Sequence, residues 1–132
     1  MVMYWLNLKF VVMDTAPTGH TLLLLDATGA YHREVSRQMI DSDVHFLTPM
    51  MQLQDPKQTK VLLVTLAETT PVMEAANLQA DLRRAGIEPW AWVINNSIAA
   101  ATVHSPLLCQ RAANELPEIA AVANLHSRRY AV

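Results

Sequence analysis

Three short apolar runs, each followed by a segment of helical character, limit most strongly what this chain can fold into. The runs cover residues 9–13, 61–65 and 90–94. An apolar run without alternation is typical of a parallel strand that is covered on both faces. Strands that alternate with helices favour βαβ units. We therefore expect an α/β fold, with a parallel sheet of three to four strands flanked by helices.

Two of the helices carry start and stop signals. After the second run, Thr70 and Pro71 are typical of an N-cap and a first helical position, and Gly86 is well placed as the C-terminal cap. Ser105 and Pro106 repeat the start signal before a second helix. The apolar residues at helical spacing are Val72, Ala75, Leu78, Leu82 and Ala85 in the first helix, and Leu108, Ala112 and Leu116 in the second. Residues 128–132 resemble the start of another strand, and a short helix is expected within residues 41–58.

Composition narrows the class of protein. A chain of 132 residues with 52% hydrophobic and 17% charged residues has the size and the apolar content of one globular domain. A net charge of −2 without a basic stripe argues against nucleic acid or an anionic membrane as partners. The single cysteine, Cys109, excludes an internal disulfide, fits a cytosolic protein and is expected in the core. No apolar run approaches the roughly 20 residues that span a bilayer, and no export signal is recognised.

Residues 14–21 form the strongest local motif, because they follow a predicted strand at the edge where open α/β folds bind ligands. The carboxylate of Asp14 can hold a magnesium-bound water, and Gly19 lets the backbone approach a phosphate. The alternative is structural: Asp14 caps a turn and Gly19 satisfies the turn's backbone.

The same motif, continued to residue 34, closely resembles the signature stretch of the arsenical pump-driving ATPases. Residues 61–72, 77–80, 94–96 and 105–111 extend the match, so it covers about residues 10–132. These proteins are P-loop ATPases of the deviant-Walker group, related to division-site and tail-anchored-protein targeting ATPases. The resemblance implies a partial P-loop NTPase fold in which residues 10–132 are the C-terminal part of one ATPase domain, from switch II onward. Residues 1–9 do not resemble the family, which places the start site in question.

The resemblance also implies roles for individual residues. The switch II element, which senses the Mg-nucleotide, corresponds to Asp14, Thr15, Pro17 and Gly19. Asn95 and Asn96 occupy the position from which an asparagine hydrogen-bonds the adenine edge. A turn built from two adjacent amides is the alternative for that pair.

His20 matches the histidine that binds the trivalent metalloid in pumps with an allosteric arsenite or antimonite site. An imidazole alone does not hold a soft metalloid tightly, and the family supplies thiolates from other segments. A histidine hydrogen-bonded at a helix N-terminus is the equally weighted alternative for His20.

Parts of the family's machinery are missing from the sequence. The phosphate-binding loop ends in Gly-Lys-Thr, and none of the glycines Gly19, Gly29 and Gly86 precedes a lysine. Switch I and the loop that encloses the adenine are also not recognised. Phosphoryl transfer depends on positioning and charge stabilisation by such parts. We therefore expect a fragment that neither binds ATP and Mg²⁺ tightly nor hydrolyses ATP alone.

The resemblance implies a cytoplasmic subunit, peripherally associated with the membrane, that drives arsenite and antimonite extrusion with a channel subunit and an arsenic metallochaperone as partners. A non-catalytic interaction module or gene remnant, forming homo-oligomers through exposed sheet edges, is the alternative from another class. A relative of the tail-anchored-protein targeting ATPases is less favoured. Residues 26–58 leave little room for a client-binding groove and hold only the methionines Met39, Met50 and Met51. We expect the pair Met50 and Met51 to fill the core.

Overall fold

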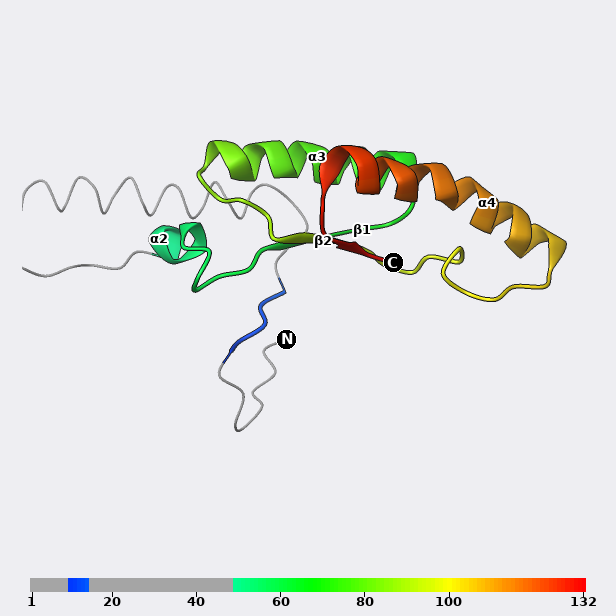
Figure 1. Ribbon diagram of the computed structural model, residues 1–132, viewed down its shortest axis with the longest axis horizontal. Helices are drawn as coiled ribbons and strands as arrows, with labels where there is room; N and C mark the ends of the chain where they lie inside the picture. Colours follow the sequence, from blue (N-terminus) through cyan, green and yellow to red (C-terminus); the bar gives the residue numbers. More distant parts are fainter. Residues whose placement is uncertain (1–9, 15–48) are drawn as a thin grey trace, which may run out of the picture. The chain divides into compact units, whose positions relative to one another are not determined.

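The computed structural model describes residues 10–14 and 49–132. The chain divides into two compact units, Met1–Val44 and His45–Val132, and each is described by itself. The second unit contains, in order, α2 (Pro49–Gln54), β1 (Leu62–Thr65), α3 (Thr69–Arg84), β2 (Ala91–Ile94), α4 (Pro106–Ala121), the π-helical turn η1 (Val122–His126) and β3 (Tyr130–Ala131) (Figure 1). The short helix expected within residues 41–58 is α2.

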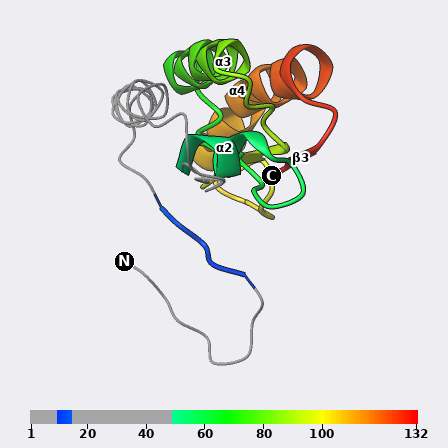
Figure 2. The same ribbon diagram turned by 90° about the vertical axis from the view of Figure 1, so that its left-hand side faces the viewer.

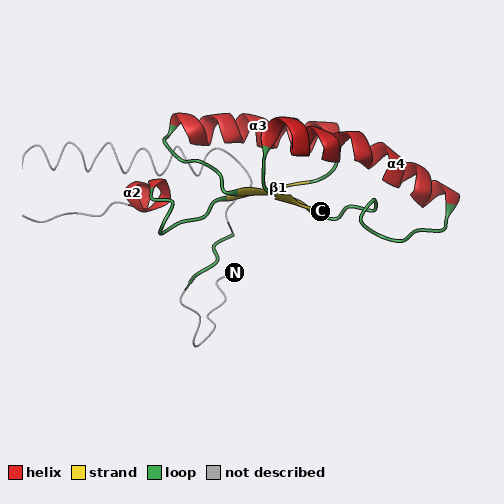
Figure 3. Ribbon diagram, viewed as in Figure 1, coloured by secondary structure: helices red, strands yellow, loops and turns green. Residues whose placement is uncertain are grey.

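The strands form a parallel sheet in the order β1-β2-β3, which is also their order along the chain. Figure 3 shows the strands in yellow, below helices α3 and α4. Leu63 is level with Trp92, and Trp92 is level with Tyr130. Helix α3 connects β1 to β2, while α4 and η1 connect β2 to β3, so both connections are βαβ crossovers. The predicted α/β architecture, a three-stranded parallel sheet flanked by helices, is confirmed, as is the strand expected near the C-terminus.

Helices α3 and α4 lie on the same face of the sheet in both views (Figures 1 and 2). Strand β1 alternates accordingly: Leu63 and Thr65 are buried, whereas Leu62 and Val64 are 48% and 62% exposed. The core between the sheet and the helices consists of Leu63, Ala67, Val72, Ala75, Leu82, Ile87, Trp92, Ile94 and Val122, with Ala91 also buried in β2. The expectation that β1 is covered on both faces is therefore wrong. An apolar run can also form a strand that is covered on one face only. Its composition does not show whether a second layer packs against the opposite face.

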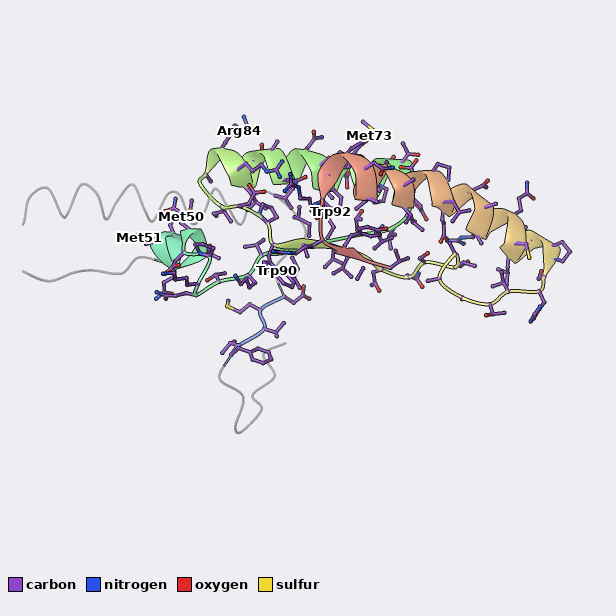
Figure 4. All side chains as sticks on the ribbon, in the orientation of Figure 1. Met50, Met51, Met73, Arg84, Trp90 and Trp92 are labelled. Atoms are coloured by element: carbon purple, nitrogen blue, oxygen red, sulfur yellow. The ribbon has the colours of Figure 1, made fainter. Side chains whose placement is uncertain are left out.

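Trp92 occupies the centre of this core. It is 1% exposed, and its ring stacks on that of His126 in η1 with centroids 5.2 Å apart. Figure 4 shows Trp92 between the sheet and the helices, whereas Met73 and Arg84 of α3 point away from the sheet. Met51 of α2 is 52% exposed, so it does not fill the core as the sequence suggested.

Residues 10–14 do not form the buried strand that the sequence predicts. They adopt no helix or strand, and Phe10, Val11, Val12 and Met13 are 65–77% exposed. A strand needs a neighbouring strand to complete its hydrogen bonds. The apolar side chains of a segment indicate that it is suited to burial, but they do not show that a second strand is present to pair with it.

Helix α3 begins slightly earlier than predicted. Glu68 is the N-cap, with extended backbone angles and no capping hydrogen bond from its side chain. Thr70 is therefore inside the helix rather than its cap, and Pro71 stands at the third helical position. The shift costs little, because N–H groups throughout the first turn lack a helical acceptor and proline removes one of them.

The C-terminal end of α3 confirms the predicted role of Gly86. The N–H of Gly86 donates to the carbonyl of Arg83 at 3.0 Å, and that of Ile87 donates to the carbonyl of Leu82 at 2.9 Å. This is the Schellman pattern, and Gly86 has the left-handed φ of 77° that the pattern requires. Ile87 and Leu82 are both buried, which supplies the apolar contact that accompanies the motif.

Replacing Gly86 with alanine is expected to lower the free energy of unfolding by about 1–2 kcal/mol, because a Cβ is disfavoured in the left-handed region. The added Cβ would also lie 3.3 Å from Nε2 of Gln54, which donates to the carbonyl of Ala85. Urea denaturation followed by circular dichroism measures the change. Gly86→Asn serves as the control, since asparagine tolerates this conformation better than alanine. An asparagine variant less stable than the alanine variant would contradict the explanation.

Helix α4 begins as predicted, with Ser105 as N-cap and Pro106 at its first position, although the serine side chain makes no capping hydrogen bond. Its apolar face is largely uncovered: Leu108 is 39% and Leu116 57% exposed. Cys109 is exposed as well, with Sγ 3.6 Å from the carbonyl oxygen of Val103, so its predicted place in the core is wrong. Helical spacing defines a face but not whether another element packs against it. The buried residue of α4 is instead Glu115.

Candidate functional site at the carboxyl ends of the strands

The residues assigned to switch II fall mostly outside the described part of the chain. Asp14 is described, is exposed and belongs to no helix or strand. Thr15, Pro17, Gly19 and the metalloid candidate His20 lie outside the described residues.

Asn95 and Asn96 follow directly on β2, at the carboxyl ends of the strands, where open α/β sheets bind ligands. The N–H of Asn95 donates to the carbonyl of Thr65 at 2.8 Å, which fixes its backbone against the end of β1. Asn96 has a φ of 56°, a left-handed conformation that asparagine adopts more readily than most residues. Both residues are exposed, so their amide side chains are accessible to a ligand at this edge.

Glu115 of α4 holds the chain that follows these two asparagines. Its Oε2 atom accepts a hydrogen bond from the Ser97 hydroxyl at 2.7 Å and another from the Ala99 N–H at 3.0 Å. Arg111, one turn earlier on α4, places Nε 3.9 Å from the other carboxylate oxygen. Glu115 is only 6% exposed. The burial of Glu115 is not evident from the sequence, because a glutamate in an amphipathic helix is normally solvated. Its only signal in the sequence is its helical offset of four from Arg111.

The donors around Glu115 keep it ionised. Burial by itself raises the pKa of a carboxyl group, but here it is outweighed by hydrogen bonds from the backbone of Ala99, the Ser97 hydroxyl and the backbone of Ile98, together with the charge of Arg111. The net effect lowers the pKa of Glu115 below its ordinary value. At neutral pH the group is a carboxylate that acts only as an acceptor.

Because the folded-state pKa of Glu115 is lowered, its contribution to stability is complete above the ordinary pKa of a glutamate and is lost as the pH falls through the folded value. We therefore expect the free energy of unfolding to decrease below about pH 4. Urea denaturation between pH 7 and pH 3 measures this slope, and Glu115→Gln should flatten it because an amide does not titrate. Glu88→Gln is the control: Arg83 lowers the pKa of Glu88 through a hydrogen bond, but both side chains are at least half exposed and the pair is screened. A slope unchanged by Glu115→Gln would contradict this account.

Beside Glu115 lies a polar pocket of about 310 Å³ between the turn that follows β1 and the middle of α4. It is lined by Ala67, Glu68, Thr69, Arg111, Asn114, Glu115 and Glu118. The Thr69 hydroxyl donates to Oε1 of Glu118 at 2.7 Å, and the Arg111 guanidinium nitrogen Nη2 lies 3.7 Å from Oε1 of Glu68. The charged walls of the pocket thus pair largely with each other.

Two further features are absent from the described part of the chain. In residues 10–14 and 49–132, no three His, Cys, Asp or Glu side chains gather in a way that could hold a metal ion. None of the helices in this part of the chain is both long enough and apolar enough to cross a bilayer.

Comparison with known proteins gives strong matches to one group. Over 124 residues, 94% of its length, the chain is 73% identical to an arsenical pump-driving ATPase of Acidiphilium multivorum and 70% identical to one of Escherichia coli. A putative arsenical pump-driving ATPase of Halobacterium salinarum is 25% identical over 115 residues, 80% of this chain. No protein-family model matches the chain.

The chain spans about a fifth of these relatives: 21% of the first two and 18% of the third. The resemblance that the sequence motifs indicate is thereby confirmed across nearly the whole chain. Its three-stranded parallel sheet and flanking helices are also consistent with part of a P-loop NTPase fold. Over 94% of its length, the chain thus corresponds to a segment of the arsenical pump-driving ATPases.

Proposed function

We propose that this chain is the segment from switch II onward of an ATP-hydrolysing subunit that drives arsenite and antimonite out of the cell through a membrane channel. The observation that carries the proposal is the 73% identity to an arsenical pump-driving ATPase over 94% of the chain. At that level, side chains that build a shared site are expected to be retained together. In this proposal, residues 10–132 are the C-terminal part of one ATPase domain.

In this proposal, Asn95 and Asn96 contribute to the nucleotide site. An amide side chain offers both a donor and an acceptor, and this combination matches the Watson–Crick edge of adenine. The pair is exposed at the carboxyl end of β2 and its backbone is fixed by Thr65. Asp14, Thr15, Pro17 and Gly19 form switch II in this proposal and respond to the Mg²⁺ of the nucleotide, and His20 contributes one ligand to an allosteric metalloid.

The partners follow from the same proposal. The ATPase acts in the cytoplasm at the membrane surface, bound to the channel subunit and receiving metalloid from a metallochaperone. The exposed carboxyl edge of the sheet faces the nucleotide, which leaves other surfaces for these contacts. The chain alone binds neither ATP nor Mg²⁺ tightly, because its sequence does not contain the Gly-Lys-Thr loop that binds the phosphates.

Segment exchange tests the proposal. The 124 matched residues of the Acidiphilium multivorum ATPase are replaced by those of this chain, and ATP hydrolysis is measured with Mg²⁺ and antimonite. We expect the chimera to hydrolyse ATP at a rate within about tenfold of the parent, since most positions are identical. The same chimera carrying Asp14→Ala is the control and should lose most of the activity. A folded chimera that does not hydrolyse ATP would overturn the proposal.

A second candidate, a non-catalytic interaction module, is favoured by one observation. The face of β1 turned away from the helices exposes Leu62 and Val64, and Leu66 beyond the strand is 38% exposed. In the described sheet, β1 and β3 are also each paired on one side only, and such edges and faces favour association. Light scattering of the purified chain tests this: a stable dimer supports the module, and a monomer at all concentrations excludes self-association as its function.

A further inference from the structure

Glu115 is an unusual residue for its helix. Every other side chain of α4 is exposed or only half-buried, and the single buried position carries a carboxylate. Removing a charge from water is costly unless hydrogen bonds compensate for it. The compensation here comes from the loop after β2, through the Ser97 hydroxyl and the Ala99 N–H. The burial of Glu115 is therefore tied to the position of that loop.

The two asparagines lie between two anchors. On the strand side, the Asn95 N–H is bonded to Thr65 of β1. On the helix side, Ser97 and Ala99 are both bonded to one oxygen of Glu115. Asn96, between the anchors, has the left-handed φ of 56°, which is less stable than right-handed or extended backbone for a residue with a Cβ. Anchors on both sides stabilise a conformation that the isolated turn would populate only in part.

We propose that Glu115 is a positioning residue that holds the turn of Asn95 and Asn96 in the conformation that presents their amides to the nucleotide base. This inference rests on the proposed function, in which these asparagines contact adenine. Glu115 does not touch the nucleotide; it acts through Ser97 and Ala99. Arg111, next to the carboxylate, helps to keep it charged and correctly oriented.

The first part of the test is structural and uses the full chain. Amide spectra and hydrogen exchange are recorded by NMR for the unaltered chain and for Glu115→Ala, Glu115→Gln and Ser97→Ala. Glu118→Gln is the matched control, since Glu118 lies one turn further along α4 and bonds Thr69 instead. We expect the Ala99 amide to exchange about tenfold faster in Glu115→Ala, as for the loss of a hydrogen bond to a charged group, and less so in Glu115→Gln, whose amide oxygen still accepts hydrogen bonds. Ser97→Ala keeps the carboxylate and should perturb Asn96 less, which provides a readable variant if Glu115→Ala does not fold.

A pH titration distinguishes the proposed role of the Glu115 carboxylate from a role of the side chain in packing alone. In the unaltered chain, the amide shifts of Ala99 and Asn96 should move together as the carboxylate protonates, and in Glu115→Gln this movement should be absent. Asn96 shifts that do not follow those of Ala99 would overturn the coupling between Glu115 and the turn.

The second part is functional and uses the chimera described above. Glu115→Ala should raise the KM for ATP about tenfold and leave kcat within about twofold, because base binding is weakened while the groups that perform phosphoryl transfer are unchanged. Glu118→Ala should change neither constant. A raised KM in Asn95→Ala with an unchanged KM in Glu115→Ala would overturn the positioning role and leave the proposed function standing. An unchanged KM in both the Asn95 and the Glu115 variant would instead show that this turn does not bind the adenine base, and would overturn the positioning role as well.

Discussion

Replacing Trp92 with alanine is expected to lower the free energy of unfolding by about 3–5 kcal/mol, the largest loss for any single side chain described in this fold. The indole is 1% exposed, sits on the central strand β2 and stacks on His126, so its removal opens a cavity between the sheet and η1. The surrounding strands cannot close this cavity without losing their register. Urea denaturation followed by circular dichroism measures the change.

Two further variants separate packing from other effects. Trp90→Ala, two residues earlier, should cost less than about 1 kcal/mol, because Trp90 is 44% exposed and its main partner is the Arg129 guanidinium, 5.3 Å from the ring centre. Trp92→Phe should be milder than Trp92→Ala, since the buried Nε1 of Trp92 has no hydrogen-bond partner to lose. Equal losses for Trp90→Ala and Trp92→Ala would show that the core is not centred on Trp92.

The purified chain is expected to hydrolyse ATP no faster than a protein-free control, with or without Mg²⁺ and antimonite. Without a Gly-Lys-Thr loop, no lysine and no row of backbone amides stabilise the charge that develops on the transferred phosphoryl group. The loss is comparable to removing the main catalytic machinery of the family, many orders of magnitude in rate. A coupled assay of ADP release over hours provides the necessary sensitivity.

The chimera makes this negative result informative, because the same residues are tested where a phosphate-binding loop is present. Activity in the chimera and none in the chain would place the deficit in the parts that the chimera adds, the phosphate-binding loop among them. Turnover by the chain alone that disappears in Asp14→Ala would contradict the expectation and require a phosphate site of a different kind. Turnover that persists in Asp14→Ala would identify a contaminating ATPase.

The parts of the fold that sequence predicted well are those governed by local chemistry. Gly86 ends α3 because few other residues adopt its backbone conformation, and Pro106 starts α4 because proline fits the first helical position. The runs that became β1 and β2 were also recognised, since consecutive apolar β-formers bounded by turn residues suit few other structures. The alternation of these signals was enough to predict a parallel sheet.

The features that the sequence did not predict are those set by tertiary contacts between different elements. The segment with Phe10 is as apolar as β1, yet it forms no strand, because pairing is a property of two segments rather than one. Cys109 was expected in the core on the basis of its residue type and is exposed. Glu115 was overlooked for the opposite reason, since its burial follows from donors on a loop 16–18 residues away. For the candidate site, motif resemblance identified Asn95 and Asn96, but their anchoring is visible only in three dimensions.

The identical order of the strands in the sheet and in the chain has a consequence for biosynthesis. Once Ile94 has been made, β1, α3 and β2 already contain each other's hydrogen-bonding partners. Because a chain emerges from the ribosome with its N-terminus first, this unit can assemble while α4 is still being translated. Trp92 and the Asn95 turn acquire their remaining partners only later, when α4 brings Glu115 to the turn and η1 brings His126 to the indole. The candidate site is thus completed after β1 and β2 have paired, by the same segment that covers the core.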